Sequence, residues 1–141
     1  MKPEETVDFH IKSAWHAISR MYNQKAVEEG FTTSIGFVLI NINSHEGTPA
    51  TKIAPLMGLE SRSITRMLKS MEERGLICRR PDPDDKRSVR IFLSPEGKRK
   101  KEKSIETIQA FNHAIRDVVT KREMEIFFRV FEKINQVIEH Q

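Results

Sequence analysis

The chain has 141 residues, of which 38% are hydrophobic and 31% are charged, and its net charge at pH 7 is +4. This composition excludes a disordered chain and is typical of a single globular domain, residues 1–141, with its own core. The only cysteine, Cys78, excludes an internal disulfide; the sequence also has no membrane span and no signal-peptide layout, so we expect a cytoplasmic protein without membrane association.

Helical periodicity predicts three helices in the first part of the chain. Residues 5–29 carry an apolar stripe at steps of three and four, which is typical of a long amphipathic helix. Thr32 or Thr33 can cap a second helix, and Thr48 is expected to cap a short third one, with a proline as its first helical residue. Gly58 is expected to end this third helix.

Residues 59–75 predict a fourth helix with two different sides. At about 100° per residue, isoleucine, leucine and methionine side chains gather on one side, and basic side chains gather on the opposite one. Small hydroxyl side chains lie near the start of the helix. The hydroxyl and basic residues of interest are Ser61, Arg62, Ser63, Thr65, Arg66 and Lys69.

Residues 76–80 and 88–93 read as two strands of a hairpin, the second from its strict alternation of side chains. The link between them, PDPDDKR, has the proline and aspartate chemistry of turns, and its prolines are expected to keep it out of the sheet. We expect Asp85 to orient either the guanidinium of Arg87 or the turn backbone. The basic residues of the charged hairpin tip and of the strand beside it are Lys86, Arg87 and Arg90.

Two further helices complete the predicted fold. Ser94 caps the first of them, and Thr120 with Glu123 forms a capping-box pattern that opens the second. The apolar face of the last helix consists of Met124, Phe127, Phe128, Phe131, Ile134 and Ile138. The predicted fold class is therefore mainly α (α+β), with the order α-α-α-α-β-β-α-α.

The helices near both termini, residues 4–30 and 95–139, carry more apolar surface than the compact region between them can cover. Pairing with a second copy would bury these faces and create a two-fold related binding site. We therefore expect a homodimer with a helical dimerisation region built from both termini. The alternative is that these helices pack only on residues 31–94.

Positive charge is concentrated in one third of the chain. Residues 61–103 carry 14 lysines and arginines against 7 acidic residues, a net charge of +7, whereas the remainder has a net charge of −3. This asymmetry favours a polyanionic partner, with nucleic acid ahead of an anionic membrane. Charge alone leaves a solvated surface as an equal alternative.

The order of the central elements favours nucleic acid. A short helix, a glycine-marked turn, a basic-faced helix and a hairpin make a winged helix-turn-helix pattern. The major groove of DNA admits one helix, and arginine pairs bidentately with guanine, so we expect Arg62 and Arg66 to set sequence choice. The hairpin is long enough to reach the adjacent minor groove, where Arg87 is the expected inserted residue. We predict that residues 31–94 form a lobe that binds double-stranded DNA sequence-specifically.

The region around this hairpin resembles the signature of the MarR family of bacterial transcription regulators. The matching positions are Gly75, Leu76, Ile77 and Arg79 at the first strand, Asp85, Arg87 and Ser88 at the wing tip, and Leu93, Ser94 and Gly97 at the exit into a helix. The order of elements fits along essentially the whole chain. The resemblance implies a homodimer with interlocked first, fifth and sixth helices, a pseudo-palindromic operator and, usually, repression. Glu60 and Pro55 depart from the family pattern and leave the boundaries of two helices open.

The resemblance also implies a small-molecule effector that releases the repressor from DNA. It places the effector pocket where the dimerisation helices meet the DNA-binding lobe. The candidate lining residues are Trp15, His16, Ser19, Phe37 and Phe111. Aromatic rings beside a few polar groups suit an aromatic or acyl ligand, although the same residues could simply be core.

Other functions have less support in the sequence. The five histidines share no spacing, and no catalytic or phosphate-binding motif is present, so we expect neither an enzyme nor a bound cofactor. His45, Glu46 and His113 lack the spacing of a metal site. Cys78 could act as a redox switch because two arginines follow it, although a bystander thiol is the simpler interpretation.

Two questions remain open at the level of sequence. A winged-helix module for protein–protein contact is the main rival to DNA binding, but it would not need an aligned basic face. The run KRKKEK, residues 98–103, could touch flanking phosphate or could be a solvated helical face.

Overall fold

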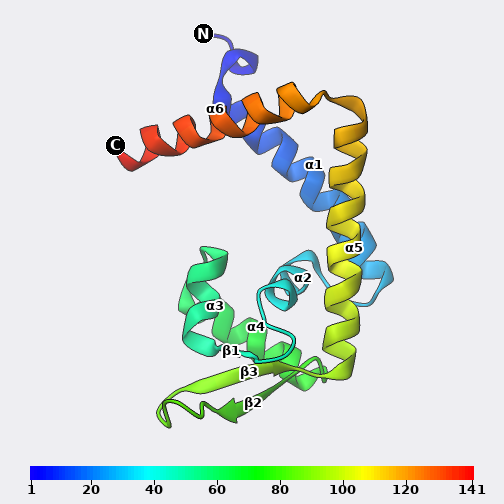
Figure 1. Cartoon of the computed structure of the whole chain (residues 1–141), viewed down its shortest axis with the longest axis vertical. Helices are drawn as coiled ribbons and strands as arrows, with labels where there is room; N and C mark the ends of the chain where they lie inside the picture. The colour runs from blue at the N-terminus through cyan, green and yellow to red at the C-terminus, as the bar shows by residue number, and fades with distance from the viewer. The chain divides into compact units, whose positions relative to one another are not determined.

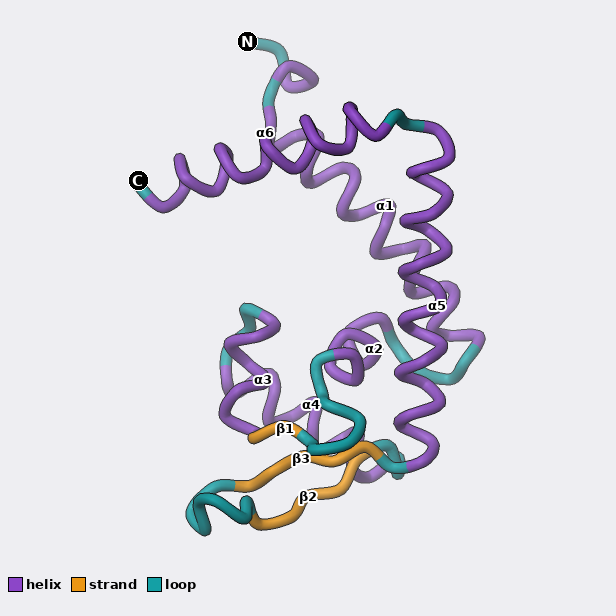
Figure 2. Tube along the Cα trace, viewed as in Figure 1, coloured by secondary structure: helices purple, strands orange, loops and turns teal.

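The computed structural model describes residues 1–141 (Figures 1 and 2). The elements in chain order are η1 (Pro3–Glu5), α1 (Val7–Glu28), α2 (Thr33–Ile40), β1 (Thr48–Pro49), α3 (Ala50–Met57), α4 (Ser61–Glu73), β2 (Ile77–Pro81), β3 (Val89–Leu93), α5 (Pro95–Val118) and α6 (Lys121–Glu139). Helices dominate and the three strands form one small sheet, which confirms the predicted winged helix-turn-helix class. Two elements were not predicted, the short 3₁₀ helix η1 and the strand β1.

The chain forms two compact units, residues 1–105 and residues 106–141. The first unit contains the elements from η1 to β3 and the beginning of α5. The second unit contains the rest of α5 and the whole of α6.

The core of the first unit lies among α2, α3, α4 and the sheet. Isoleucine, leucine and methionine side chains that recur between polar positions in the sequence fill this core, because burial against one another removes these apolar faces from water. The largest side chains that are fully buried there are Leu39, Ile42, Ile53, Met71, Ile91 and Val38.

The sheet has the order β1-β3-β2, with antiparallel pairing throughout. Thr48 lies opposite Ile91 in β1, and Ile77 lies opposite Leu93 in β2. Figure 2 shows β3 between the other two strands. The long hairpin of β2 and β3, which we call the wing, is therefore fixed to the rest of the unit along one side.

Two sequence predictions about this sheet are wrong. Thr48 does not cap α3: its hydroxyl oxygen accepts a hydrogen bond from the backbone N–H of Asn43 at 2.9 Å, and the residue pairs in β1, so the helix begins at Ala50. Pro81 is not outside the sheet, because it ends β2 opposite Val89. An edge strand tolerates proline, since the missing N–H would face solvent.

The predicted helix caps are mostly confirmed. The hydroxyl of Thr32 accepts a hydrogen bond from the backbone N–H of Ile35, and Thr120 with Glu123 forms the complete capping box of α6. Glu60 occupies the cap position of α4 without a side-chain hydrogen bond, so this helix begins without the usual stabilisation of its first N–H groups.

The start of α5 is docked closely on the sheet. Ser94 donates its backbone N–H to the carbonyl of Leu76 at 2.9 Å and its hydroxyl to the carbonyl of Gly75 at 2.6 Å. The same hydroxyl oxygen accepts the backbone N–H of Gly97 at 3.0 Å and so caps the first turn of α5. A Cβ atom on Gly97 would lie 2.0 Å from the carbonyl oxygen of Leu76. Only glycine therefore allows this approach of helix and strand.

Two lysines of the basic run at the start of α5 turn back onto the first unit. Lys100 donates to the carbonyl of Glu29 at the end of α1 and lies over the ring of Phe31, while Lys101 donates to the carbonyl of Ile42 at 2.6 Å, just beyond the end of α2. Cations are favourable at the C-terminal ends of helices, where carbonyl groups lack partners. The sequence left open whether the basic run contacts DNA phosphate or forms a solvated helical face. The side chains of Lys100 and Lys101 do neither in this structure, because they bind backbone carbonyls of the protein itself.

The second unit leaves a large apolar surface uncovered. No residue of α6 is buried, and the side chains of Phe127 and Phe128 are 51% and 49% exposed. The rings of Phe127 and Phe131 pack on each other with centroids 4.7 Å apart and planes tilted by 52°, so these aromatic side chains gather on one face of α6.

Candidate nucleic-acid interface

Helix α4 buries one side and exposes the other, as its sequence pattern indicates. Ile64, Leu68 and Met71 are buried in the core of the first unit. The exposed side includes every basic residue predicted on this helix, and none of them forms an ion pair or a side-chain hydrogen bond. These free basic residues are Arg62, Arg66 and Lys69.

The three hydroxyl residues of α4 differ in their environments. Ser61 is exposed at the first helical position, and Ser63 is half-buried. Thr65 is exposed, but its hydroxyl donates to the carbonyl of Ser61 at 2.9 Å, so it offers an external partner only acceptor sites.

The tip of the wing, residues 82–88, lies at the far end of the hairpin (Figure 1). Lys86 and Arg87 are exposed there, and neither forms an ion pair or a side-chain hydrogen bond. The two cations are thus free to meet an external anion.

Asp85 holds the backbone of the wing tip. One of its carboxylate oxygens accepts the backbone N–H of Arg87 at 3.0 Å, and the other accepts the hydroxyl of Ser88 at 3.2 Å. Of the two roles expected from sequence, the turn backbone is the one that the hydrogen bonds fit. The guanidinium of Arg87 stays unbound.

Arg90 does not join the other basic residues predicted for this surface. Its Nε atom lies 3.3 Å from a carboxylate oxygen of Asp82, and an Nη1 N–H donates to the carbonyls of Glu46 and Gly47. The alternation of side chains along β3 is compatible with an outward Arg90 side chain. In the structure its guanidinium instead binds these acceptors of the same unit.

Two further arginines near the wing are also occupied. Arg79 pairs with Glu72 at 3.5 Å, and the guanidinium of Arg80 lies 5.1 Å from the centre of the Phe92 ring. Cys78 is half-buried between these arginines and Ile77 along β2. The arginines on which the redox hypothesis depends are thus engaged elsewhere.

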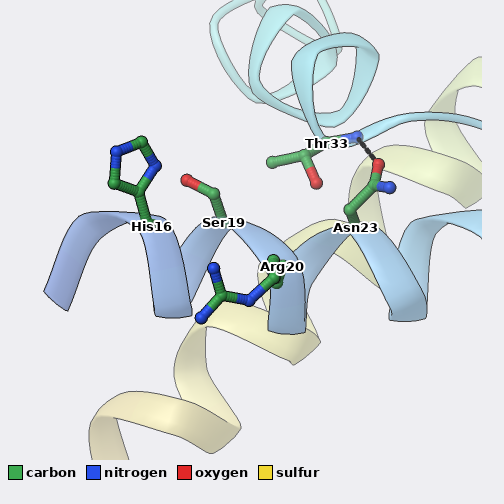
Figure 3. Close-up of a pocket in the computed structure, with 5 residues that line it drawn as sticks. All are labelled: His16, Ser19, Arg20, Asn23 and Thr33. Atoms are coloured by element: carbon green, nitrogen blue, oxygen red, sulfur yellow. Dashed lines mark hydrogen bonds between the residues drawn. The ribbon is translucent and has the colours of Figure 1, made fainter. Parts of the chain in front are cut away.

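A shallow pocket of about 320 Å³ lies between α1 and the start of α2 (Figure 3). All of its lining residues are polar or charged, and Figure 3 shows Asn23 projecting from α1 toward Thr33. The backbone N–H of Thr33 donates to the side-chain oxygen of Asn23 at 3.5 Å, whereas the hydroxyl of Thr33 is buried without a partner. The lining residues are His16, Ser19, Arg20, Asn23 and Thr33.

The structure brings together only part of the predicted effector pocket. His16 and Ser19 line it, but Trp15 and Phe37 pack on each other with ring centroids 6.4 Å apart. Phe111 belongs to the second unit.

The sequence prediction of the pocket missed Arg20, Asn23 and Thr33. The first two follow His16 at helical steps of four and three, so a search for periodic polar positions could have found them. No sequence pattern signals Thr33, which reaches the pocket only through the packing of α2 on α1.

No group of three or more histidine, cysteine or acidic residues is placed to hold a metal ion. None of the helices is both long and apolar enough to cross a membrane.

Comparison with known proteins identifies the family. The model of the MarR family matches residues 31–89, from just before α2 to the first residue of β3. The organic hydroperoxide resistance transcriptional regulator of Bacillus subtilis is 30% identical over 106 residues, which cover 75% of this chain and 72% of that protein. The chain belongs to the MarR family of transcriptional regulators. The matches to three further relatives, each named as a transcriptional regulator or regulatory protein, cover between 44% and 54% of each of those proteins.

Solved structures share the fold of this MarR-family chain at low sequence identity. The MepR–DNA complex of S. aureus superimposes with a TM-score of 0.85 at 19% identity, covering 94% of this chain and 98% of that one. CouR from Rhodococcus jostii RHA1, bound to p-coumaroyl-CoA, gives a TM-score of 0.83 at 21% identity, with 95% and 94% covered. These likenesses show the winged-helix fold.

Proposed function

We propose that this MarR-family regulator binds a pseudo-palindromic operator in double-stranded DNA as a homodimer. One observation carries the proposal: the basic residues of α4 and of the wing tip are exposed and unpaired, while Arg79, Arg80 and Arg90 are occupied within the protein. We call this set the basic surface, and it consists of Arg62, Arg66, Lys69, Lys86 and Arg87.

The two halves of the basic surface have different tasks in this proposal. Helix α4 enters the major groove, where Arg62 and Arg66 read base edges. The hydroxyls of Ser61 and Ser63 form hydrogen bonds with bases or phosphates, and the hydroxyl of Thr65 accepts hydrogen bonds from bases. The wing tip approaches the adjacent minor groove with Arg87, held by Asp85 at its backbone. The MepR structure, which has this fold and is bound to DNA, supports the assignment.

The homodimer rests on the uncovered helical surface. Residues 4–30 and 95–139 are the proposed dimerisation region, and residues 31–94 are the proposed DNA-binding lobe. An aromatic face such as that of α6 is costly in water, and a second copy offers a matching face. Two lobes about 34 Å apart would meet successive major grooves on one side of the duplex.

The pocket between α1 and α2 is the proposed effector site, and repression with release by the effector is the proposed mode of control. The polar side chains around the pocket suit the carboxyl or acyl oxygens of an aromatic or acyl ligand. CouR, which shares the fold, is bound to an aromatic acyl thioester. A ligand that binds better to one lobe spacing shifts the population toward it and away from the operator.

The proposal gives the chain no catalytic activity. The matched relative is a transcriptional regulator, and the basic surface lacks the paired acid, base or nucleophile that catalysis requires.

The test is DNA binding to the chain's own upstream region over a range of salt concentrations. Arg87→Ala removes a phosphate-side contact, so affinity should fall for all sequences and the slope of log K against log salt should flatten by about one unit. Arg66→Ala should cost about 1–3 kcal/mol and relax the preference at one base pair. Lys2→Ala, the same charge change at an exposed position outside both the basic surface and the proposed dimerisation region, is the control.

Wild-type binding by both arginine variants would show that the basic surface is wrongly assigned. Failure of the wild-type protein to bind any DNA would instead favour a protein–protein module.

A further inference from the structure

Arg90 connects the wing to a distant loop of the same unit. Its guanidinium lies between Asp82, the first residue of the wing tip, and the loop that precedes β1. Nε is 3.3 Å from Oδ2 of Asp82, and an Nη1 N–H donates to the carbonyl oxygens of Glu46 at 3.1 Å and Gly47 at 3.3 Å. The side chains of Arg90 and Asp82 are only 19% and 6% exposed, so water screens this pair less than a surface ion pair.

On the wing side, Asp82 is tied directly to the tip. Its Oδ1 accepts the backbone N–H of Asp84 at 2.9 Å, and its own N–H donates to the carbonyl of Ser88 at 3.0 Å. The pKa of Asp82 lies below its ordinary value, first because of the Asp84 N–H and then because of the positive charge of Arg90. The carboxylate that holds Arg90 thus also holds the start of the wing tip.

On the loop side, the acceptors of Arg90 are themselves fixed. The side-chain oxygen of Asn43 accepts the backbone N–H groups of His45 and Glu46 at 2.9 and 2.8 Å. Gly47 has φ +69°, and a Cβ there would lie 2.6 Å from the carbonyl oxygen of Ile91. The loop therefore offers a rigid point of attachment, pressed against β3.

A competing position for the Arg90 side chain is disfavoured. Arg90 lies directly opposite Arg80 in the β2–β3 ladder, and like charges at such positions repel. The Arg80 guanidinium lies over Phe92, and the Arg90 guanidinium goes to the carboxylate and the carbonyls.

We propose that Asp82 and Arg90 form a brace that positions the wing for DNA, and that neither residue contacts DNA itself. The brace holds the wing tip at the angle where Arg87 reaches the duplex. This inference rests on the proposed function, because it requires that the wing contributes to operator binding. It replaces the sequence prediction that Arg90 is a direct DNA contact.

The brace and the net charge predict opposite changes in operator affinity when Asp82 is replaced. Asp82→Asn removes a negative charge close to the basic surface, so phosphate attraction by itself predicts tighter binding. Loss of the brace predicts weaker binding, by about threefold to tenfold and by no more than Arg87→Ala causes. Asparagine can still accept the Asp84 N–H, so the turn keeps its own hydrogen bond.

Asp84→Asn is the matched control. It makes the same charge change two residues away, on an exposed side chain that does not bond Arg90. We expect operator binding equal to wild type or slightly tighter.

Arg90→Lys tests the other end of the brace without changing the charge. A direct phosphate contact tolerates lysine, whereas a compact ammonium cannot serve the carboxylate and two carbonyls that the planar guanidinium spans. The brace predicts a loss similar to that of Asp82→Asn, and this variant carries the test if Asp82→Asn does not fold by circular dichroism.

The decisive measurement repeats Asp82→Asn in the Arg87→Ala background. A positioning role predicts no further loss there, because the contact that the brace positions is already absent, and a general loss of stability would still lower affinity. Tighter or unchanged binding of folded Asp82→Asn, wild-type binding of Arg90→Lys, or fully additive losses would overturn the brace. If Arg87→Ala itself binds as wild type, the wing contact of the proposed function fails and the brace fails with it.

Discussion

Replacing Gly97 with alanine should destabilise the first unit more than replacing any glycine in an open turn. The new Cβ would start 2.0 Å from the carbonyl oxygen of Leu76 and 3.1 Å from its carbon, and both are backbone atoms that cannot rotate away. Helix α5 and the backbone of Leu76, just before strand β2, would have to separate. Separation weakens two hydrogen bonds of Ser94, one to the carbonyl of Leu76 and one to that of Gly75.

The magnitude follows from three contributions. Forcing extra volume into a packed site costs about 1–3 kcal/mol, and each weakened hydrogen bond costs about 1 kcal/mol. Alanine recovers about 1 kcal/mol of helix propensity relative to glycine. The expected net loss for Gly97→Ala is about 2–4 kcal/mol of the free energy of unfolding.

The assay is chemical denaturation at a fixed protein concentration, since dimerisation would couple stability to concentration. The control is Gly75→Ala, where φ is +74° and no atom lies within 4 Å of the new Cβ. That change should cost only the left-handed backbone penalty of about 1–2 kcal/mol. A Gly97→Ala protein as stable as wild type, or more stable than Gly75→Ala, would refute the steric reasoning.

Three further outcomes are expected. The pKa of Glu96 is lowered from 4.5 to about 2, chiefly by the hydrogen bond that its carboxylate accepts from Arg99. The stabilising effect of this carboxylate is therefore full above pH 4.5 and is lost as the pH falls toward 2. Glu96→Gln should flatten the rise of the free energy of unfolding with pH in that window, and an unchanged pH dependence would contradict this. Phe127→Asp should convert the homodimer to monomer in light scattering, while Gln136→Asp, on the opposite side of α6, should leave it dimeric; a dimer in both cases would exclude this face from the interface. An aromatic carboxylic acid that occupies the pocket should raise Tm and weaken operator binding, and Ser19→Tyr, which fills the pocket, should abolish both effects; effects that survive in Ser19→Tyr would place the ligand elsewhere.

Local patterns in the sequence predicted the helices well. The capping box at Thr120 and Glu123 and the cap at Ser94 depend on residues within one turn, and so their hydrogen bonds can be read from spacing alone. The two sides of α4 follow from periodicity for the same reason.

Features that depend on distant partners were not predictable. Strand β1 has two residues and exists because Thr48 meets Ile91, which lies far along the chain. The inward turn of Arg90 depends on the carbonyls of a loop more than forty residues earlier. Alternation along a strand predicts the side of the sheet on which a residue lies, but it does not predict which hydrogen-bond acceptors lie on that side.

The candidate site shows the same division. Spacing alone could place the basic residues of α4 and of the wing on exposed positions. It could not tell which arginines are occupied, because Glu72 and Asp82 approach them only in the folded chain.

The lysines that cap α1 and α2 decide where this protein can be joined to a relative. A hybrid that exchanges residues 31–94 would leave Lys100 with the carbonyl of Glu29, but it would give Lys101 a foreign partner in place of the carbonyl of Ile42. Exchange of residues 1–105 keeps both pairs within one parent, at the boundary of the first compact unit. Recombination between family members should therefore be tolerated better at a junction inside α5 than at the loop that precedes it, where the Lys101 contact changes parent.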